Sequence, residues 1–263
     1  MGVRSFAFAF LMLAANGAWS AECTKMMVSG NEEYPPNSWR DKQNPDKLIG
    51  AAIEVIEMAM KDTGVKVETK YMGTWKQFHD GAKRGSVDVM AGGYINDERK
   101  TYLEYVSPAY YMDPTVLFVK KGKAFPFSKK EDLVGRKGAQ HIGESFGQDF
   151  DAYAKANLKI EHLQTNQLAF DRLLGGDVDY VLGGLYPLLA VAEIEGWRDR
   201  LEHLPKEVVS EGMYIAITKS SPCVKYKELL EKKIAQYVKD GTSQRLLDKY
   251  LVVWGEQTKV KKK

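Results

Sequence analysis

The sequence is poor in net charge, in cysteine and in long apolar runs. Its 38 basic and 35 acidic residues leave a net charge of only +3, which is too small to argue for nucleic acid as a partner. With 44% hydrophobic and 28% charged residues, the 263-residue chain has the composition of a globular protein, and long disorder is excluded. The length suits one large domain or two small ones, each able to bury a core.

Only the first twenty residues carry a clear apolar run. Residues 6–15 are apolar, follow Arg4, and are too few to span a bilayer, which takes about 20 residues. Ala18 and Ser20 supply the small residues required for cleavage after Ser20. We therefore expect residues 1–20 to be a secretory signal peptide and the mature chain to reside in the periplasm.

The two cysteines are Cys23 and Cys223. An even count in an exported chain favours a disulfide between them. A lipid anchor on Cys23 is disfavoured because the residue before it is Glu22 rather than a small residue, and two free thiols are the other alternative. At the far end, a basic tail with the character of a solvated terminus is formed by Lys259, Lys261, Lys262 and Lys263.

Motifs for metals, nucleotides and glycans are missing. The four histidines, His79, His141, His162 and His203, are scattered without the spacing of metal ligands. The paired glycines lack the context of a dinucleotide fingerprint, and there is no P-loop. We expect neither a metal nor a cofactor.

Hydrophobic periodicity indicates alternating strands and helices. Residues 25–29 read as a strand, residues 51–61 as a helix, and residues 65–71 alternate as a half-buried strand. Thr74 and Gln77 form a capping box for a helix that ends near residue 84, before a short apolar strand at residues 87–91. This order predicts an α/β fold with a mainly parallel sheet.

The pattern then repeats. Residues 85–93 (GSVDVMAGG) and 176–184 (GDVDYVLGG) match at an offset of 91 residues. A second capping box is expected at Ser128 and Glu131, and helices at the segments 150–156, 168–174, 224–238 and 243–250.

Two extended segments, 116–119 and 213–217, are placed to join two lobes as a hinge. We expect lobe one to comprise residues 21–115 and 214–263, lobe two residues 116–213, and a ligand cleft between them.

Residues 85–100 (GSVDVMAGGYINDERK) and 105–111 (YVSPAYY) carry a resemblance to a known family. They resemble the periplasmic solute-binding proteins of family 3, which serve ABC importers of polar amino acids and related solutes. The resemblance implies a type II periplasmic binding protein fold: two α/β lobes joined by two hinge strands. It also implies a monomer, not an enzyme, that captures a small polar or carboxylate-bearing solute by hinge closure and delivers it to a membrane permease.

The resemblance assigns ligand-binding residues in lobe one. It implies that Arg99 forks onto a ligand carboxylate, with further contacts from Gly92 and Tyr94. Tyr94 stands where a small hydroxyl residue is commoner, so a narrower pocket is expected. The resemblance also implies aromatic walls at Tyr34 and Trp75 and a polar contact at Asn31; the alternative for Trp75 is that it only packs its helix on the sheet.

Lobe two departs from the family pattern. The turn expected to cradle the carboxylate contains His141, Gly143, Glu144 and Ser145. Gly184 stands where the family places an aspartate that binds the α-ammonium group, and Asp179 is expected to be structural. Either Glu144 or Glu32 substitutes for that acid, or the ligand lacks the ammonium group. We expect the second: Glu144 facing solvent, no acid in the wall beside Gly184, and poor binding of standard α-amino acids.

Three alternative functions stay open. Residues 143–147 (GESFG) match the nucleophile-elbow pattern, with Asp179 and His203 in hydrolase order, although the preceding segment is too polar for a central hydrolase strand. Some relatives in the resembled family are cyclohexadienyl-type dehydratases, for which Glu144 or His141 could act as acid or base. The third is a ligand sensor for a signalling partner.

Overall fold

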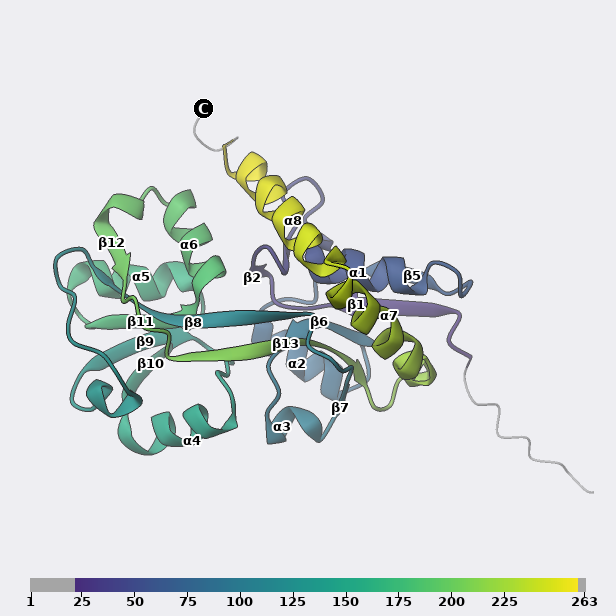
Figure 1. Cartoon of the computed structure of the whole chain (residues 1–263), viewed down its shortest axis with the longest axis horizontal. Helices are drawn as coiled ribbons and strands as arrows, with labels where there is room; N and C mark the ends of the chain where they lie inside the picture. Colours follow the sequence, from purple (N-terminus) through teal and green to yellow (C-terminus); the bar gives the residue numbers. More distant parts are fainter. Residues whose placement is uncertain (1–21, 260–263) are drawn as a thin grey trace, which may run out of the picture.

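The computed structural model describes residues 22–259, so the expected signal peptide and most of the basic tail lie outside the described residues. A ten-stranded sheet with helices packed around it confirms the α/β prediction (Figure 1). The sheet is mixed instead of mainly parallel, because its two central strands pair antiparallel with all their neighbours. Its strands run in the order β10-β9-β11-β8-β13-β6-β1-β5, with β12 beside β8 and β7 beside β13. Within the described part of the chain, no helix is long and apolar enough to cross a membrane.

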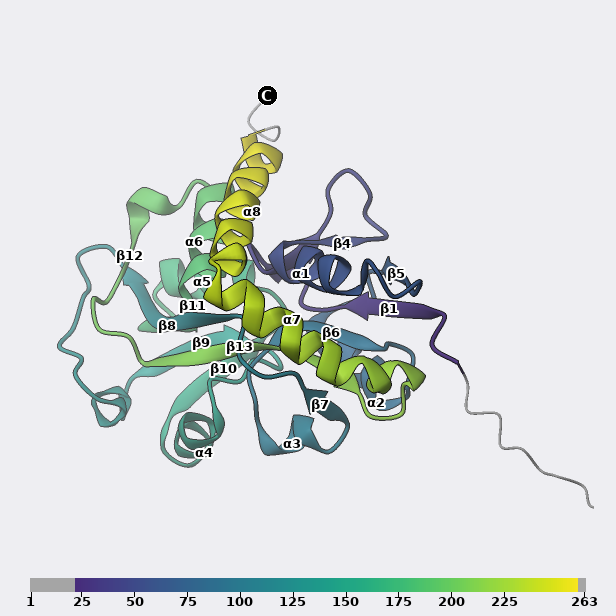
Figure 2. The same ribbon diagram turned by 45° about the vertical axis from the view of Figure 1, so that its right-hand side comes forward.

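Two long antiparallel strands, β8 (Tyr111–Lys120) and β13 (Val209–Thr218), run through the centre of the sheet and divide it into two halves. The first half contains the strands β1 (Lys25–Ser29), β5 (Lys66–Thr69), β6 (Val89–Gly93) and β7 (Leu103–Tyr105), the helices α1 (Ala51–Met60), α2 (Trp75–Lys83), α3 (Asp97–Lys100), η3 (Pro222–Tyr226), α7 (Lys227–Lys239) and α8 (Thr242–Lys259), and the small sheet of β2 (Glu33–Tyr34), β3 (Ser38–Arg40) and β4 (Leu48–Ile49). Figure 2 shows α7 and α8 on this half, and both pack against α1.

The second half is built from the middle of the chain. It contains the strands β9 (Lys137–His141), β10 (Lys159–Leu163), β11 (Tyr180–Gly184) and β12 (Leu201–His203) and the helices η1 (Lys130–Leu133), α4 (Gln148–Asn157), α5 (Asn166–Gly175), α6 (Leu185–Ile194) and η2 (Arg198–Arg200). The chain leaves the first half through β8 and returns through β13. The expected lobe boundaries fall inside these two strands, and that division stays a prediction.

The repeat in the sequence has a counterpart in the topology. β6 pairs in parallel with β1 and antiparallel with β13, while β11 pairs in parallel with β9 and antiparallel with β8. The aspartates of the two repeats also act alike: Asp88 accepts a hydrogen bond from the backbone N–H of Met27 at 2.7 Å, and Asp179 accepts one from that of Lys137 at 2.8 Å. The expectation that Asp179 is structural is confirmed.

Some of the predicted helix ends are correct and others are wrong. The capping box of Thr74 and Gln77 is present at the start of α2. The second predicted box is wrong: Ser128 donates to Asp132 instead of pairing with Glu131, and the segment forms the short 3-10 helix η1. The last helix, α8, is longer than the predicted 243–250 because Trp254 continues its packing against Trp39 of β3.

Cys23 and Cys223 form a disulfide, with Cα atoms 5.0 Å apart and 200 residues of separation. Both cysteines are buried. The bond joins the start of β1 to η3, immediately before α7, so it ties the two ends of the first half together.

Candidate functional site

The predicted site residues lie in segments that follow the strands of both halves. Asn31 and Tyr34 follow β1, and Tyr94 follows β6. In the second half, the turn with Glu144 follows β9, and Gly184 ends β11. Ligands in open α/β sheets bind outside the carboxyl ends of the strands, so the topology places these residues at a suitable position.

An inner pocket lies between the halves, and most of the predicted residues line it. The lining consists of Asn31, Tyr34, Asn37, Trp75, Gly92, Gly93, Tyr94, Arg99, Glu144 and Met213. Its volume is about 10 Å³, which is no more than one water molecule requires. In this conformation the halves touch directly where a solute would lie, so a bound solute must replace those contacts.

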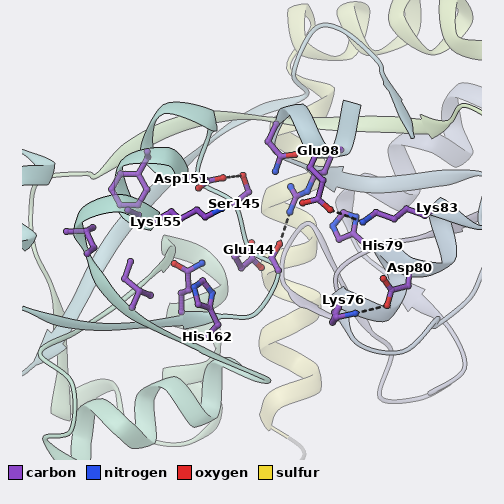
Figure 3. Close-up of a pocket in the computed structure, with 18 of the residues that line it drawn as sticks. Lys76, His79, Asp80, Lys83, Glu98, Glu144, Ser145, Asp151, Lys155 and His162 are labelled. Carbon is purple, nitrogen blue, oxygen red and sulfur yellow. Dashed lines mark hydrogen bonds and ion pairs between the residues drawn. The ribbon is translucent and has the colours of Figure 1, made fainter. Parts of the chain in front are cut away.

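A larger cavity of about 700 Å³ opens on the outer side of the same interface. Figure 3 shows Lys76, His79 and Lys83 of α2 on one side of it and Ser145, Asp151 and Lys155 of the second half on the other. Arg99 and Glu144 line both spaces, so the outer cavity is adjacent to the inner pocket.

Arg99 connects the two halves. Asn96 caps the short helix α3 by accepting from the backbone N–H of Arg99 at 2.8 Å, which fixes the backbone from which the side chain extends. Arg99 is only 4% exposed. Its Nη1 donates to the carbonyl of Tyr94 at 3.0 Å, and its Nη2 donates across the interface to the carbonyl of Gly143 at 2.9 Å. A ligand carboxylate at Arg99 would replace the carbonyl of Gly143.

Glu144 does not face solvent, so that prediction is wrong. Its side chain is 9% exposed, and its Oε1 accepts a hydrogen bond from Asn31 Nδ2 across the interface at 2.8 Å. Burial raises the pKa of Glu144 to about 8, although the positive charge of Arg99 acts in the opposite direction. The turn after β9 brings an acid into the pocket because Asn31 supplies it with a donor there.

The wall beside Gly184 also contains an acid, which contradicts the second part of the same prediction. Asp113 of β8 is fully buried, and its Oδ2 accepts hydrogen bonds from the hydroxyls of Tyr34 at 2.8 Å and Tyr94 at 2.9 Å. A Cβ atom at position 184 would lie 2.1 Å from the Tyr34 hydroxyl. Position 184 is glycine because Tyr34 occupies the space that a side chain there would need.

Sequence reasoning missed Asp113 and Asn37, whereas it had named Glu32 as a possible substitute for the acid missing at Gly184. Asn37 lines the pocket, and its Nδ2 donates to the carbonyl of Ala91 at 2.9 Å. Burial raises the pKa of Glu32 to about 7 and that of Asp113 to about 6. One signal was available for Asp113, because it is the only charged residue in the apolar segment 110–119.

The two predicted aromatic walls both reach the pocket, from different elements. Trp75 begins α2, stacks on Phe78 at 5.0 Å, and has the guanidinium of Arg99 5.4 Å from its ring centre. It therefore packs its helix and also lines the pocket, so both interpretations of Trp75 describe part of what it does.

The remaining residues of the turn after β9 have distinct surroundings. His141 is buried with its Nδ1 3.9 Å from Glu144 Oε1, and burial lowers its pKa to about 4. Ser145 lines the outer cavity and donates to Asp151.

The hydrolase alternative does not fit this arrangement. His203 lies on β12 and contacts the ring of Phe118, and Asp179 is held by the backbone of Lys137. The three members of the suggested triad are engaged by different partners instead of by one another. Among residues 22–259, no group of three or more His, Cys, Asp or Glu side chains could hold a metal ion.

Comparison with known proteins decides the family. The profile of the bacterial extracellular solute-binding proteins, family 3, matches residues 26–253, which is most of the chain. The chain belongs to this family. A curated member from Haemophilus influenzae, named "Probable amino-acid ABC transporter-binding protein", is 30% identical over 161 residues. That match covers 60% of this chain and 61% of the relative, less than two thirds of its length.

Solved structures of periplasmic-binding-protein type share the fold. An ancestral arginine-binding protein bound to arginine is 27% identical and has a TM-score of 0.70; the match covers 86% of this chain and 98% of that protein's chain. A histidine kinase sensor domain with similarity to periplasmic binding proteins is 21% identical with the same TM-score of 0.70 and covers 86% and 96% of the two chains. The chain therefore has the type II periplasmic binding protein fold.

Proposed function

We propose that this protein captures a small amino-acid-like solute between its two halves and delivers it to an ABC importer. The observation that carries the proposal is the meeting of Arg99 and Glu144, from opposite halves, at one buried pocket. Arg99 and Glu144 now form hydrogen bonds to the opposite half. If a solute supplied the hydrogen-bond partners instead, the same two residues would hold the halves closed around it. The curated relative is named as a binding protein of an amino-acid ABC transporter, which supports this class of solute.

Closure would work by exchange of contacts. In this conformation, Arg99 donates to the carbonyl of Gly143 and Asn31 donates to Glu144. A solute that offers an acceptor to Arg99 and a donor to Glu144 would bridge both halves. Such a solute binds the closed form better than the open form, so it shifts the population towards closure. β8 and β13 are the connections on which the halves would move.

A thermal-shift screen of amino acids, amines and organic acids tests the proposal. A ligand present at about 100 times its dissociation constant should add about 2.7 kcal/mol to the stability of the protein, which raises its melting temperature measurably. Hits should compete with one another, because they share one pocket. If no compound in these three classes raises the melting temperature, the proposed function fails.

Delivery to an importer is tested separately. The liganded protein should stimulate the ATPase of its partner permease complex, reconstituted in vesicles. A signalling partner would instead respond to the liganded protein without solute uptake, which is the sensor alternative.

A further inference from the structure

Asp113 lies at the centre of a group of tyrosines directly behind the inner pocket. Its Oδ2 accepts from Tyr34 and Tyr94, and from the Tyr111 hydroxyl at 3.3 Å. Its other oxygen, Oδ1, is buried and has no hydrogen-bond partner in the part of the chain that the structure describes. Tyr34 and Tyr94, whose hydroxyls bond Asp113, both line the pocket, so Asp113 lies one residue away from a solute bound there.

The hydroxyl protons of Tyr34 and Tyr94 are taken up by hydrogen bonds among these tyrosines and Asp113. A tyrosine hydroxyl has one proton and can also accept. Tyr34 and Tyr94 each lie within hydrogen-bond distance of Asp113, and their oxygens are 3.1 Å apart. Whether both donate to Asp113 or one donates to the other, neither keeps a proton for the pocket. Both can therefore offer a solute only acceptor lone pairs.

Two asparagines of the pocket lining use their side-chain N–H groups on protein acceptors. Asn37 uses its Nδ2 on the carbonyl of Ala91, and its Oδ1 is buried with no partner among residues 22–259. Asn31 uses its Nδ2 on Glu144 and its Oδ1 on the backbone of Glu33. Among the described residues, Arg99 and the unpartnered Nε1 of Trp75 are the donors of the lining, so the demand for N–H groups on the solute is confined to the two tyrosine hydroxyls and Asn37 Oδ1.

We propose that the tyrosine pair held by Asp113 is the receptor for a cationic, N–H-rich group of the solute, an ammonium or a guanidinium. Asp113 is a positioning residue in this proposal: it fixes the hydroxyl protons and contributes negative charge behind them. It does the work of the acid that is missing at Gly184, where the Tyr34 hydroxyl takes the space of a side chain. The proposal deepens the proposed function and rests on it.

Charge and aromatic surface favour the same class of solute. Asp113 is fully buried behind the pocket, and Glu144 and the cation Arg99 line it. Burial raises the pKa of Asp113 only to about 6, so Asp113 is mostly ionised at neutral pH and needs a nearby positive charge. Aromatic side chains such as Tyr34 and Trp75 tolerate a cation close to their faces.

The first experiment ranks solutes by charge with calorimetry on the mature, disulfide-bonded protein. The panel contains arginine, lysine, agmatine and putrescine, the uncharged-side-chain compounds glutamine and citrulline, and the acids glutamate and succinate. The tightest ligand should be a cation. If glutamate or succinate binds most tightly, the inference is overturned while the proposed function stands; if nothing binds, the proposed function itself fails.

The second experiment asks whether Asp113 is the cause. The best cation is compared with analogues that each replace one cationic nitrogen by a neutral isostere; for arginine these are citrulline and the 2-hydroxy analogue, which separate the guanidinium from the α-ammonium. For the wild type, one of these analogues should have a dissociation constant at least about tenfold higher than that of the cation. In Asp113→Asn, the two dissociation constants should differ by no more than about threefold. An amide at position 113 donates N–H bonds and frees a tyrosine proton, so it removes the preference for cations.

Matched variants keep the result interpretable. Asp177→Asn removes a negative charge from the second half, where Asp177 pairs with Arg172 at 2.7 Å, and it should leave the discrimination ratio unchanged. If Asp113→Asn does not fold, Tyr34→Phe removes one hydroxyl acceptor and should lower the same ratio. An unchanged ratio in the folded Asp113 or Tyr34 variant overturns the inference.

Discussion

At the scale of single residues, the site is defined by buried ionisable groups that come from both halves. Arg99 is nearly fully buried, and the carbonyls of Tyr94 and Gly143 accept its hydrogen bonds. Glu144 lies buried beside it and is held by Asn31. These groups contribute both to recognition and to the stability of this conformation, so single substitutions should change both.

Arg99→Ala should weaken binding of the best ligand by more than about 2 kcal/mol, because a charge-assisted fork is lost. The melting temperature of the ligand-free variant should also fall, since the loss of Arg99 leaves two carbonyls without their donor. Calorimetry and thermal unfolding of the variant check both effects, and an unaltered affinity would remove Arg99 from the site.

Glu144→Gln tests the buried acid through pH. The folded pKa of Glu144 is raised to about 8, so its stabilising contribution is complete below its unfolded value near 4.5 and is lost as pH rises through about 8. Glutamine keeps an acceptor for Asn31 and carries no charge. The variant should therefore gain melting temperature relative to the wild type between about pH 5 and pH 9. The exposed Glu228→Gln is the control, and parallel curves for wild type and Glu144→Gln would contradict this account.

Site residues that belong to a continuous motif could be predicted from the sequence, whereas those defined by contacts between distant residues could not. Arg99, Tyr94 and Gly92 belong to one continuous motif, and Tyr34 and Trp75 follow from the same resemblance. Asp113 contacts Tyr34 and Tyr94 from positions 79 and 19 residues apart, and no local pattern encodes such pairs. Glu144 was misplaced for the same reason, since its partner Asn31 is 113 residues away.

At the scale of elements, short helices and strand ends hold the site residues in place. α2 begins at Trp75, and its start is fixed by the side chains of Thr74 and Gln77. The strands β6 and β11 end in glycine pairs at equivalent points of the two halves. Alternating periodicity and capping boxes predicted most of these elements, whereas η1 escaped because Asp132, one residue beyond the expected partner, accepts from Ser128.

Thr74→Ala should lower the free energy of unfolding by about 1 kcal/mol, the usual value for a helix N-cap. Lys76→Ala in the same turn removes only the exposed ion pair with Asp80, so it should change stability by no more than about 0.5 kcal/mol. Urea unfolding of both variants measures the difference. Equal stabilities for Thr74→Ala and Lys76→Ala would show that the cap does not matter.

Gly184→Ala tests the fit of β11 against the first half. The added Cβ would meet the Tyr34 hydroxyl at 2.1 Å, so Tyr34 must move away from Asp113. Binding of the best ligand should weaken at least about tenfold. Gly122→Ala is not a suitable control because of its positive φ, whereas Ser210→Ala changes a residue of β13 outside the pocket. Unchanged affinity in Gly184→Ala would show that Tyr34 does not contribute to ligand binding.

At the scale of the whole molecule, the first half is closed by the disulfide and the two halves are joined by two strands. Replacing both Cys23 and Cys223 by serine should lower the free energy of unfolding by about 2–5 kcal/mol, mainly by freeing the unfolded chain. Denaturant unfolding under oxidising conditions measures the loss. Coinciding curves for wild type and variant would mean that the bond does not form in solution.

Movement of the halves about β8 and β13 is the central claim, and a distance measurement tests it most directly. Spin labels at positions 83 and 155, on opposite sides of the outer cavity (Figure 3), report the separation of the halves by pulsed electron resonance. A saturating ligand from the calorimetric panel should remove the long distances of the open form and leave the short distances of the closed form, and the same concentration should not do so in Arg99→Ala. Identical distributions with and without a ligand that demonstrably binds would contradict capture by closure.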